Sequence, residues 1–336
     1  MESCNPCGSS KDRVALRILQ DGLRGTPAGA SPLKRVYEGT SGSTGISLGL
    51  IARSFGMGTR VWLPDDTAAD KVSLLSKVGA DVVQVPNVSI VNPKHYVNLA
   101  RSSADEDSAA VFADQFETPS NVAVHYDTTG PEIWEQTEGR LHAFIAGAGT
   151  GGTLAGVSQF LKEKSSGSVR VALADPPGSS LFHWAKNGVA YTPQQAERSI
   201  RRHRYDTIIE GVGLDRVTAN MRHALVDDAF QVSDQEAVDM ARWLLQEEGL
   251  FIGSSSAMNL AGAVKLARKL PPGSTIVTLL CDHGSRHLAR FWNDQYLTEN
   301  SLQAPRLLQP DEEEAPASCA GAPLPYLPHG SVDFVH

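Results

Sequence analysis

The sequence predicts an α/β protein built on parallel β-sheets, and three observations favour this fold class. Short β-rich runs alternate with helical stretches over most of the 336 residues. One strand, helix and strand unit repeats at a spacing of about 20 residues. The second half of the chain then shows the same alternation of predicted strands and helices as the first. This rhythm is typical of a doubly wound sheet, whose helices cover both faces.

The first half predicts a helix that precedes the first strand. Val14, Ile18 and Leu19 recur at helical spacing, and Gly8-Ser9-Ser10 stands where a helix cap is expected. The expected helices cover residues 10–23, 44–55 and 69–78, and the expected strands cover residues 34–38, 59–64 and 80–85.

The second half repeats the alternation. Helices are expected over residues 153–162, 237–248 and 257–269, and strands over residues 143–146, 169–174 and 275–280. The last of these strands is almost entirely apolar, as expected in a sheet that is covered on both faces. Beyond it, residues 302–336 are rich in proline and contain the acidic run Asp311 to Glu314. Such a segment cannot bury a core, so we expect a disordered tail over residues 298–336.

Composition and charge exclude several classes of function. The formal net charge of −8 argues against a general nucleic-acid binder, which would carry a basic surface. No apolar run is long enough for a membrane span, and no signal peptide is recognisable, so we expect a cytoplasmic protein without a membrane partner. Mitochondrial association is the alternative if an upstream segment exists. Cys4 and Cys7 have the spacing of half a metal or redox site, but no second pair completes it, so we expect no metal.

A first candidate site is Lys11, which follows the loop Asn5 to Ser10 in the first turn of a predicted helix. The electropositive helix N-terminus disfavours an ammonium group and so helps to free the amine. A free amine can bond covalently to a carbonyl carbon. By itself this position does not distinguish such chemistry from a solvated surface lysine.

Two loops are candidate anion-binding sites. The run Glu38 to Gly45 offers hydroxyls and backbone N–H groups at a helix N-terminus, which suits a carboxylate or a phosphate. The run Gly147 to Gly156 follows a strand and opens a helix, and its glycines let a phosphate approach the backbone closely. The second loop also fits the dinucleotide fingerprint, with Asp175 at a suitable distance for a ribose contact. A nicotinamide-dependent dehydrogenase would leave the other two clusters without a role.

The order and spacing of the three clusters resemble the fold type II pyridoxal-phosphate enzymes of the cysteine synthase and cystathionine β-synthase family. The resemblance covers about residues 4–295 and is closest to the fungal-type cysteine synthases, through Val88 to Val91 and His95 to Arg101. Further matching motifs are Asp114 to Asn121, His125 to Trp134, Glu210 to Gly213, Gly253 to Ala257 and Asp282 to Arg286. The resemblance implies a tryptophan synthase β-like fold with two doubly wound parallel-sheet domains. The implied large cofactor domain covers residues 1–30 and 138–297, and the small substrate-side domain covers residues 31–137.

The resemblance implies pyridoxal 5'-phosphate as cofactor and β-replacement on an activated serine. Lys11 would bind the cofactor covalently and then act as the general base at Cα. The implied substrate-carboxylate ligands are Thr40, Ser41, Gly42, Thr44 and Gln115. The implied cofactor ligands, besides Lys11, are Ser43, Gly149, Thr150, Gly151, Gly152, Thr153 and His283. The favoured reaction converts O-acetylserine and sulfide into L-cysteine and acetate. The implied small-molecule partners are therefore an amino acid and sulfide or a thiol. The resemblance also implies a homodimer.

Three departures from the family pattern keep alternatives open. Members normally carry an early strand and an N-terminal arm before the lysine loop, so the resemblance implies a shortened N-terminus. Ser43 replaces an asparagine that contacts the cofactor ring oxygen, and His283 replaces a serine that faces the ring nitrogen. A cystathionine β-synthase-like condensation of serine with homocysteine, and an inactive paralogue, therefore remain alternative functions.

Overall fold

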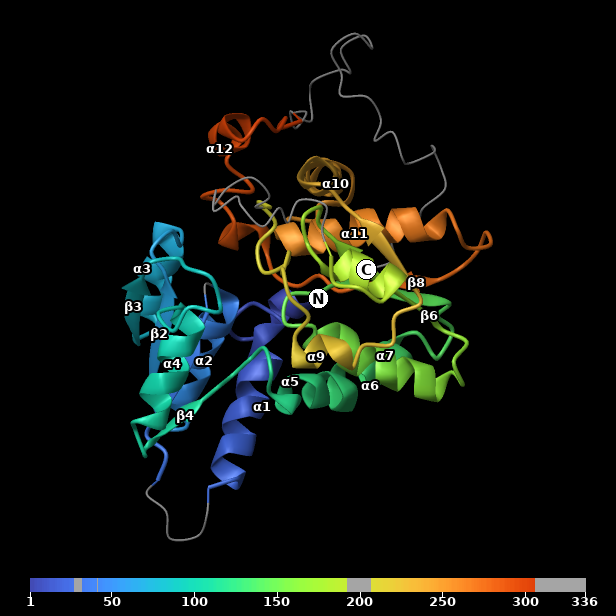
Figure 1. Cartoon of the computed structure of the whole chain (residues 1–336). Helices are drawn as coiled ribbons and strands as arrows, with labels where there is room; N and C mark the ends of the chain where they lie inside the picture. The colour runs from blue at the N-terminus through green and yellow to red at the C-terminus, as the bar shows by residue number, and fades with distance from the viewer. Residues whose placement is uncertain (27–31, 41, 192–206, 306–336) are drawn as a thin grey trace.

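A computed structural model describes residues 1–26, 32–40, 42–191 and 207–305. It contains two four-stranded sheets, in the orders β3-β2-β1-β4 and β7-β6-β5-β8. All strand pairs are parallel. The two sheets belong to two lobes that lie side by side in Figure 1. The predicted α/β fold with two parallel-sheet domains is therefore confirmed.

The first sheet is covered on both faces. Successive side chains along its strands point to opposite faces, and apolar residues lie on each face. Val36 packs in one cluster with the helices on one face, whereas Tyr37 packs with Trp62 and α4 on the other. The strands are β1 (Arg35–Gly39), β2 (Gly58–Pro64), β3 (Ala80–Val85) and β4 (Ala110–Phe112). The helices that follow them in this lobe are α2 (Ser43–Ser54), α3 (Ala69–Lys77) and α4 (Tyr96–Asp105).

Helix α1 (Lys11–Arg24) packs against the first sheet's lobe. Its buried residues Val14, Ile18 and Leu19 share a core cluster with Leu48 of α2. Apolar residues at this spacing form one helical stripe, which explains the packing. The assignment of residues 1–30 to the other domain, and the boundaries at 137 and 297, stay predictions.

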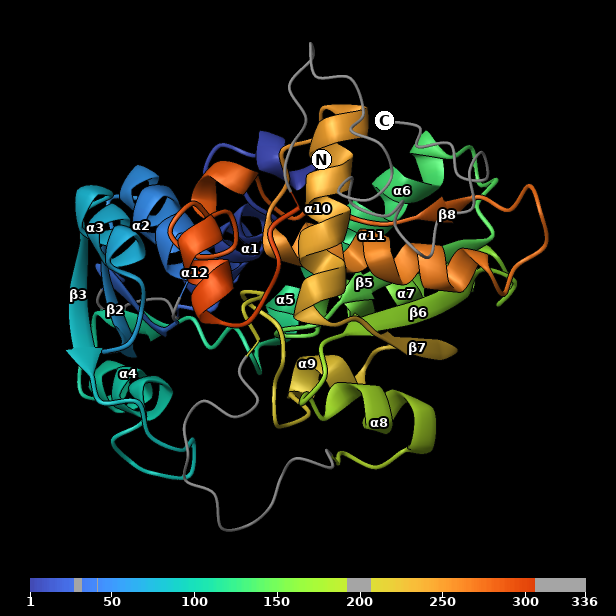
Figure 2. The same cartoon turned by 90° about the horizontal axis from the view of Figure 1, so that it is seen from above.

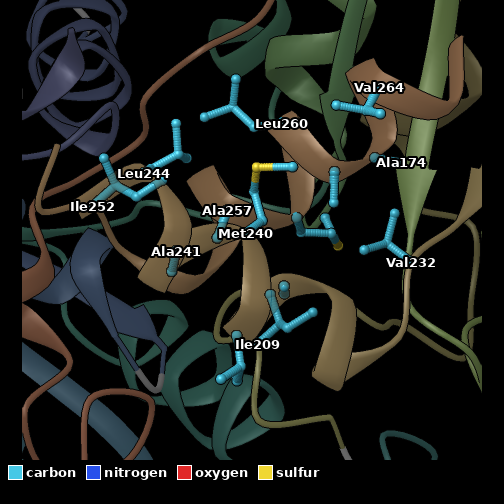
Figure 3. Packing of buried hydrophobic residues seen from close by; sticks show 14 of the residues in the cluster. Ala174, Ile209, Val232, Met240, Ala241, Leu244, Ile252, Ala257, Leu260 and Val264 are labelled. Carbon is cyan, nitrogen blue, oxygen red and sulfur yellow. The ribbon is translucent and has the colours of Figure 1, made fainter. Parts of the chain in front are cut away.

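The second sheet also separates two core clusters. Along β5 (Ala143–Gly147), Ala143 and Ile145 face one cluster, and Phe144 and Ala146 face the other. Helices α10 (Asp234–Glu248) and α11 (Ser254–Ala267) supply the first cluster, where Met240, Leu244 and Leu260 pack together (Figure 3). The remaining strands are β6 (Arg170–Asp175), β7 (Asp228–Gln231) and β8 (Ile276–Val277). The helices of the other face include α7 (Gly152–Lys164), α8 (Leu181–Asn187) and α9 (Ala219–Arg222).

Short helices connect the two lobes. The segment made of α5 (Pro119–Val124), the π-helical turn His125–Thr129 and α6 (Gly130–Gln136) packs on α7, and α5 also packs on α1. Single 3₁₀ turns occur at Glu2–Cys4 and Gly284–Arg286. Helix α12 (Asp294–Glu299) lies between α3 and α10 (Figure 2). No helix among the described residues is long and apolar enough to cross a membrane.

Two predicted elements differ from the structure. The strand expected over residues 275–280 pairs only at Ile276 and Val277. At the next residue, the Thr278 side-chain hydroxyl donates to the Ile145 carbonyl at 2.6 Å. The disordered tail expected from residue 298 is wrong for its described beginning. There, the backbone of Gln303 exchanges two hydrogen bonds with the Gln235 side chain. Residues 306–336 of that expected tail lie outside the described residues.

Candidate active site

A cavity of about 750 Å³ lies between the two lobes. Its walls include Lys11 at the start of α1, Thr40 just beyond β1, and Gly147 at the end of β5. Parallel α/β sheets place ligand-binding loops at the carboxyl ends of their strands. The cavity therefore occupies the position where this architecture normally binds a ligand.

Lys11 lies in the cavity wall as the first residue of α1, and its side chain is half-buried. Its Nζ donates to the Ser10 hydroxyl at 3.2 Å. The loop before it is anchored to the other lobe, because the Ser10 N–H donates to the Cys281 carbonyl at 3.1 Å and Ser9 forms a β-bridge with Asp282. This anchoring fixes the position of the lysine relative to the second sheet.

The loop expected to bind a substrate carboxylate contributes Thr40, Gly42 and Thr44 to the cavity wall. The Thr44 hydroxyl donates to Gln115 Oε1 at 2.5 Å, so these two predicted ligands also meet each other. The Gln115 backbone carbonyl accepts from the side-chain amides of Asn121 at 2.7 Å and Asn220 at 2.9 Å. These bonds hold Gln115 firmly against the cavity. Ser41 lies outside the described residues.

The glycine-rich loop between β5 and α7 also lines the cavity, with Gly149, Thr150, Gly151 and Thr153. A Cβ atom at Gly149 would lie 1.9 Å from the Gly211 carbonyl oxygen. Gly151 has a φ of +83°, and a Cβ atom there would lie 2.6 Å from Met221 Cα. Only glycine lets this loop pack so closely against the backbone behind it.

Gly152 differs from its neighbours because it does not line the cavity in the described structure. A Cβ atom at Gly152 would lie 2.0 Å from Asn121 Oδ1, so its lack of a side chain serves packing behind the loop. Asn121 in turn donates to the Thr150 hydroxyl at 3.0 Å. The Thr153 hydroxyl contacts His125 Nε2 at 3.0 Å. Burial, with the nearby cations Lys11 and Arg13, lowers the pKa of His125 to about 3, so this ring is neutral.

These residues fit a phosphorylated aldehyde. The first N–H groups of α7 lack helical acceptors and can bind a phosphate where the glycines leave room for it. The amine of Lys11, which lines the same cavity, has the chemistry to bond to an aldehyde. Both requirements of pyridoxal phosphate are met within one cavity.

Ser43 and His283, the two departures from the family pattern, have different surroundings. Ser43 lines the cavity and accepts from Arg286 Nη2 at 3.3 Å. His283 does not line the cavity; its Nδ1 contacts the Ser285 hydroxyl at 2.9 Å, and its ring packs against Phe251. Neighbouring residues of an extended chain point to opposite sides, so Asp282 faces the cavity while His283 faces away.

A buried ionic cluster at the cavity edge was missed by the sequence analysis. Glu210 pairs with Lys71 of α3, and its Oε2 lies 3.0 Å from Nδ1 of His287. Nε2 of His287 lies 3.0 Å from the Asp282 carboxylate. All four residues line the cavity. Glu210 and Asp282 both lie in motifs quoted for the resemblance, but sequence separation concealed that they share one histidine.

The charges of this cluster follow from its contacts. Burial alone would lower the pKa of His287, but the carboxylates of Asp282 and Glu210 outweigh burial and raise that pKa to about 9. Burial alone would raise the pKa of Glu210, but His287 and Lys71 lower it to about 2. The histidine is therefore a cation at neutral pH, held between two carboxylates.

The dinucleotide interpretation finds no support at Asp175. This residue is buried and does not line the cavity, and its carboxylate accepts from the Phe182 N–H at 2.8 Å. Cys4, Cys7 and Cys281 are free thiols. Among the described residues, no group of three or more potential ligands could hold a metal ion.

Comparison with known proteins identifies the family. Residues 1–282 match the model of the family described as pyridoxal-phosphate dependent enzyme. The chain belongs to the pyridoxal-phosphate dependent enzyme family. The match excludes the dehydrogenase alternative and agrees with the fit of the cavity to this cofactor.

Individual members of the pyridoxal-phosphate dependent enzyme family are similar over most of the chain. Cysteine synthase 2 of Schizosaccharomyces pombe is 46% identical over 90% of this chain and 78% of its own length. The putative mitochondrial cysteine synthase of Saccharomyces cerevisiae is 46% identical over 88% of this chain and 77% of its own. Among solved structures, the O-acetylserine dependent cystathionine β-synthase of Helicobacter pylori has a TM-score of 0.74 and 30% identity, covering 86% of this chain and 87% of that one.

Proposed function

We propose that this chain is a cysteine synthase, which converts O-acetylserine and sulfide into L-cysteine and acetate. One observation carries the proposal. A single cavity between the lobes is lined by Lys11, by the glycine-rich loop, and by the proposed carboxylate ligands Thr40, Thr44 and Gln115. The similarity to cysteine synthases at 46% identity supports the same reaction. The substrates would be the amino acid and sulfide.

Lys11 is the proposed catalytic residue. Pyridoxal phosphate supplies the electron sink that makes removal of the substrate Cα proton feasible. The Lys11 amine would anchor this cofactor covalently, and, once freed by the substrate amine, would take the proton from Cα. Acetate then leaves from Cβ, sulfide adds there, and Lys11 returns a proton to Cα. The Ser10 hydroxyl, which lies 3.2 Å from Nζ, can orient the amine.

The substrate carboxylate is proposed to bind Thr40, Ser41, Gly42, Thr44 and Gln115. Thr44 lies in the first turn of α2, where the helix N-terminus favours a negative charge. The hydrogen bond between Thr44 and Gln115 fixes both side chains before the substrate arrives. Such preorganisation lowers the entropy cost of binding.

The cofactor phosphate is proposed to bind Gly149, Thr150, Gly151 and Thr153 at the start of α7. Gly152 supports this loop by its packing against Asn121. Ser43 remains a proposed ligand of the cofactor ring, since it lines the cavity. His283 is not proposed to contact the cofactor, because its ring packs against Phe251 outside the cavity.

Condensation with homocysteine is the second candidate. It is favoured by the similarity to the Helicobacter pylori enzyme, which is an O-acetylserine dependent cystathionine β-synthase. With O-acetylserine as the common substrate, the two reactions share all steps at Cα and differ in the sulfur nucleophile that adds at Cβ; with serine, water leaves in place of acetate. The cavity therefore has to be tested with both nucleophiles.

A homodimer in the cytoplasm is proposed for the assembly and location. Leu16 and Leu23 lie on one side of α1 about two helical turns apart, and they are 40% and 38% exposed. Such residues suit a surface covered by a second copy. Light scattering tests the dimer, and Leu16→Glu should shift it toward monomer. Cell fractionation tests the location, with the mitochondrion as the alternative given the yeast relative's name.

The decisive assay supplies purified protein and pyridoxal phosphate with O-acetylserine and either sulfide or L-homocysteine. Formation of L-cysteine at the higher kcat/KM supports the proposal. Preferential formation of cystathionine favours the second candidate. If neither product forms, the chain is an inactive paralogue and the proposed function is wrong.

A further inference from the structure

Glu38 is a buried carboxylic acid directly behind the proposed carboxylate site. It lies near the end of β1, one residue before Gly39, and its side chain has no exposed surface. Its Oε2 accepts from the Gln115 N–H at 3.2 Å. Its Oε1 has no hydrogen-bond partner among the described residues. Glu38 does not line the cavity, so it can act only through its neighbours.

The environment of Glu38 favours the neutral acid. Burial, together with the nearby Asp114 and against the opposing effect of the Gln115 N–H, raises its pKa to about 8. The titratable groups that face it are Asp114, in the loop after β4, and Tyr96, in the first turn of α4. Tyr96 remains neutral at these pH values because burial, with Glu38 itself, raises its pKa to about 12. Arg101 pairs with Asp114 at 3.2 Å and so offsets part of the charge of that carboxylate.

Glu38 is connected to the cavity through one residue. Gln115 receives the Glu38 contact at its backbone nitrogen and the Thr44 hydroxyl at its side-chain oxygen. Gln115 and Thr44 both line the cavity beside Thr40. A negative charge on Glu38 would thus lie behind the groups proposed to hold the substrate carboxylate.

We propose that Glu38 is a positioning residue whose neutral form holds Gln115 in place for the substrate carboxylate and whose ionisation weakens substrate binding. The inference rests on the proposed function, since it concerns the same amino-acid site. Ionisation would add a like charge behind the substrate carboxylate in a region of low dielectric. A like charge about 10 Å away, at an effective dielectric of about 20, weakens binding on the order of ten-fold.

The test is the pH profile of KM for O-acetylserine, measured with kcat from neutral pH to pH well above 8. In the native enzyme, KM is expected to rise on the order of ten-fold through the titration of Glu38, with a smaller change in kcat. Glu38→Gln keeps an oxygen acceptor for the Gln115 N–H but cannot ionise, so its KM should lack this rise. A rise of equal size in Glu38→Gln would overturn the proposal.

A second variant keeps the inference testable if Glu38→Gln does not fold. Asp114→Asn removes the neighbouring charge that raises the pKa of Glu38, and asparagine tolerates the positive φ of 48° at this position. The rise in KM should therefore begin at lower pH in Asp114→Asn. An unchanged or upward-shifted profile contradicts the role of Glu38.

A matched control comes from another buried carboxyl. Burial also raises the pKa of Asp175, to about 7, but this residue does not line the cavity. Asp175→Asn should keep the native rise of KM with pH. If this rise disappeared in Asp175→Asn, the result would count against the role of Glu38. Calorimetric affinity for L-cysteine gives a readout independent of turnover and should weaken over the same pH range. If the proposed function is wrong, the native protein shows no turnover. If only this inference is wrong, the native protein turns over, and its pH profile of KM is the same as that of Glu38→Gln.

Discussion

The ammonium group of Lys71 on α3 pairs with the carboxylate of Glu210 in the second lobe. The two side chains are only 17% and 19% exposed and lie at the edge of the cavity. Glu210 also contacts His287, which extends the cluster further within the second lobe. The pair therefore joins the two lobes beside the proposed substrate site.

Replacing Lys71 with methionine should destabilise the fold, because it leaves Glu210 without its partner from the first lobe. Removal of one partner from a fully buried pair costs about 3–5 kcal/mol. Because this pair is partly exposed and Glu210 keeps its contact with His287, the free energy of unfolding should fall by a smaller amount, on the order of 1–3 kcal/mol. Urea denaturation measures this change. The double variant Lys71→Met/Glu210→Gln should lose less than the sum of the two single variants. Strict additivity would mean that the pair does not couple the lobes.

The pH dependence of stability should report His287. Its folded pKa of about 9 lies above the unfolded value of 6.5, so protonation stabilises the native state. This contribution is complete below the unfolded value and is lost as the pH rises through the folded value. The midpoint of urea unfolding should therefore fall across this range in the native protein.

His287→Gln is the matched variant for that experiment. It cannot be protonated, so the fall in stability that continues above the folded pKa of Glu38, about 8, and through that of His287, about 9, should disappear. A curve that keeps the native slope in His287→Gln would assign the titration to another group.

Replacing Gly149 with alanine should weaken cofactor binding. The new Cβ atom would lie 1.9 Å from the Gly211 carbonyl oxygen, so the loop must move away from its position at the start of α7. We expect a loss in affinity for pyridoxal phosphate of at least about ten-fold, by analogy with the cost of overpacking. Fluorescence titration with the cofactor measures the affinity.

Gly58→Ala provides the control for Gly149→Ala. A Cβ atom at Gly58 would lie 3.8 Å from its nearest neighbour, and Gly58 does not line the cavity. Its affinity for the cofactor should equal that of the native protein. If both alanine variants bound pyridoxal phosphate with equal affinity, the assignment of the glycine-rich loop to the phosphate site would be contradicted.

Local patterns predicted the elements whose signals are local. The strand Ala80–Val85 has the predicted bounds, and α2 begins at Ser43, one residue before its predicted start. Helix α4 was missed because His95, which is not a usual capping residue, accepts from the Val97 N–H at its N-terminus. Strand β4 was missed because its three residues are too few to show a period.

The site was predictable only where one motif carries the chemistry. Lys11, Thr44 and Gly149 each lie in a short, uninterrupted sequence motif, and the structure brings the three motifs to one cavity. The orientation of His283 depends on the extended backbone at this residue, which no pattern of residue types reveals. The contact of Glu210 with Lys71 joins residues 139 positions apart, and the burial of Glu38 is a property of the packed sheet. These relationships required the fold.

The most direct test of the central claim is the visible absorption spectrum of the purified protein with pyridoxal phosphate, before and after O-acetylserine. The native protein should show the band of covalently bound cofactor, and this band should shift on addition of the amino acid. Lys11→Ala should lack the covalent band while retaining the fold. No band in the native protein, or a band unaffected by Lys11→Ala, would contradict the assignment of Lys11 as the catalytic residue.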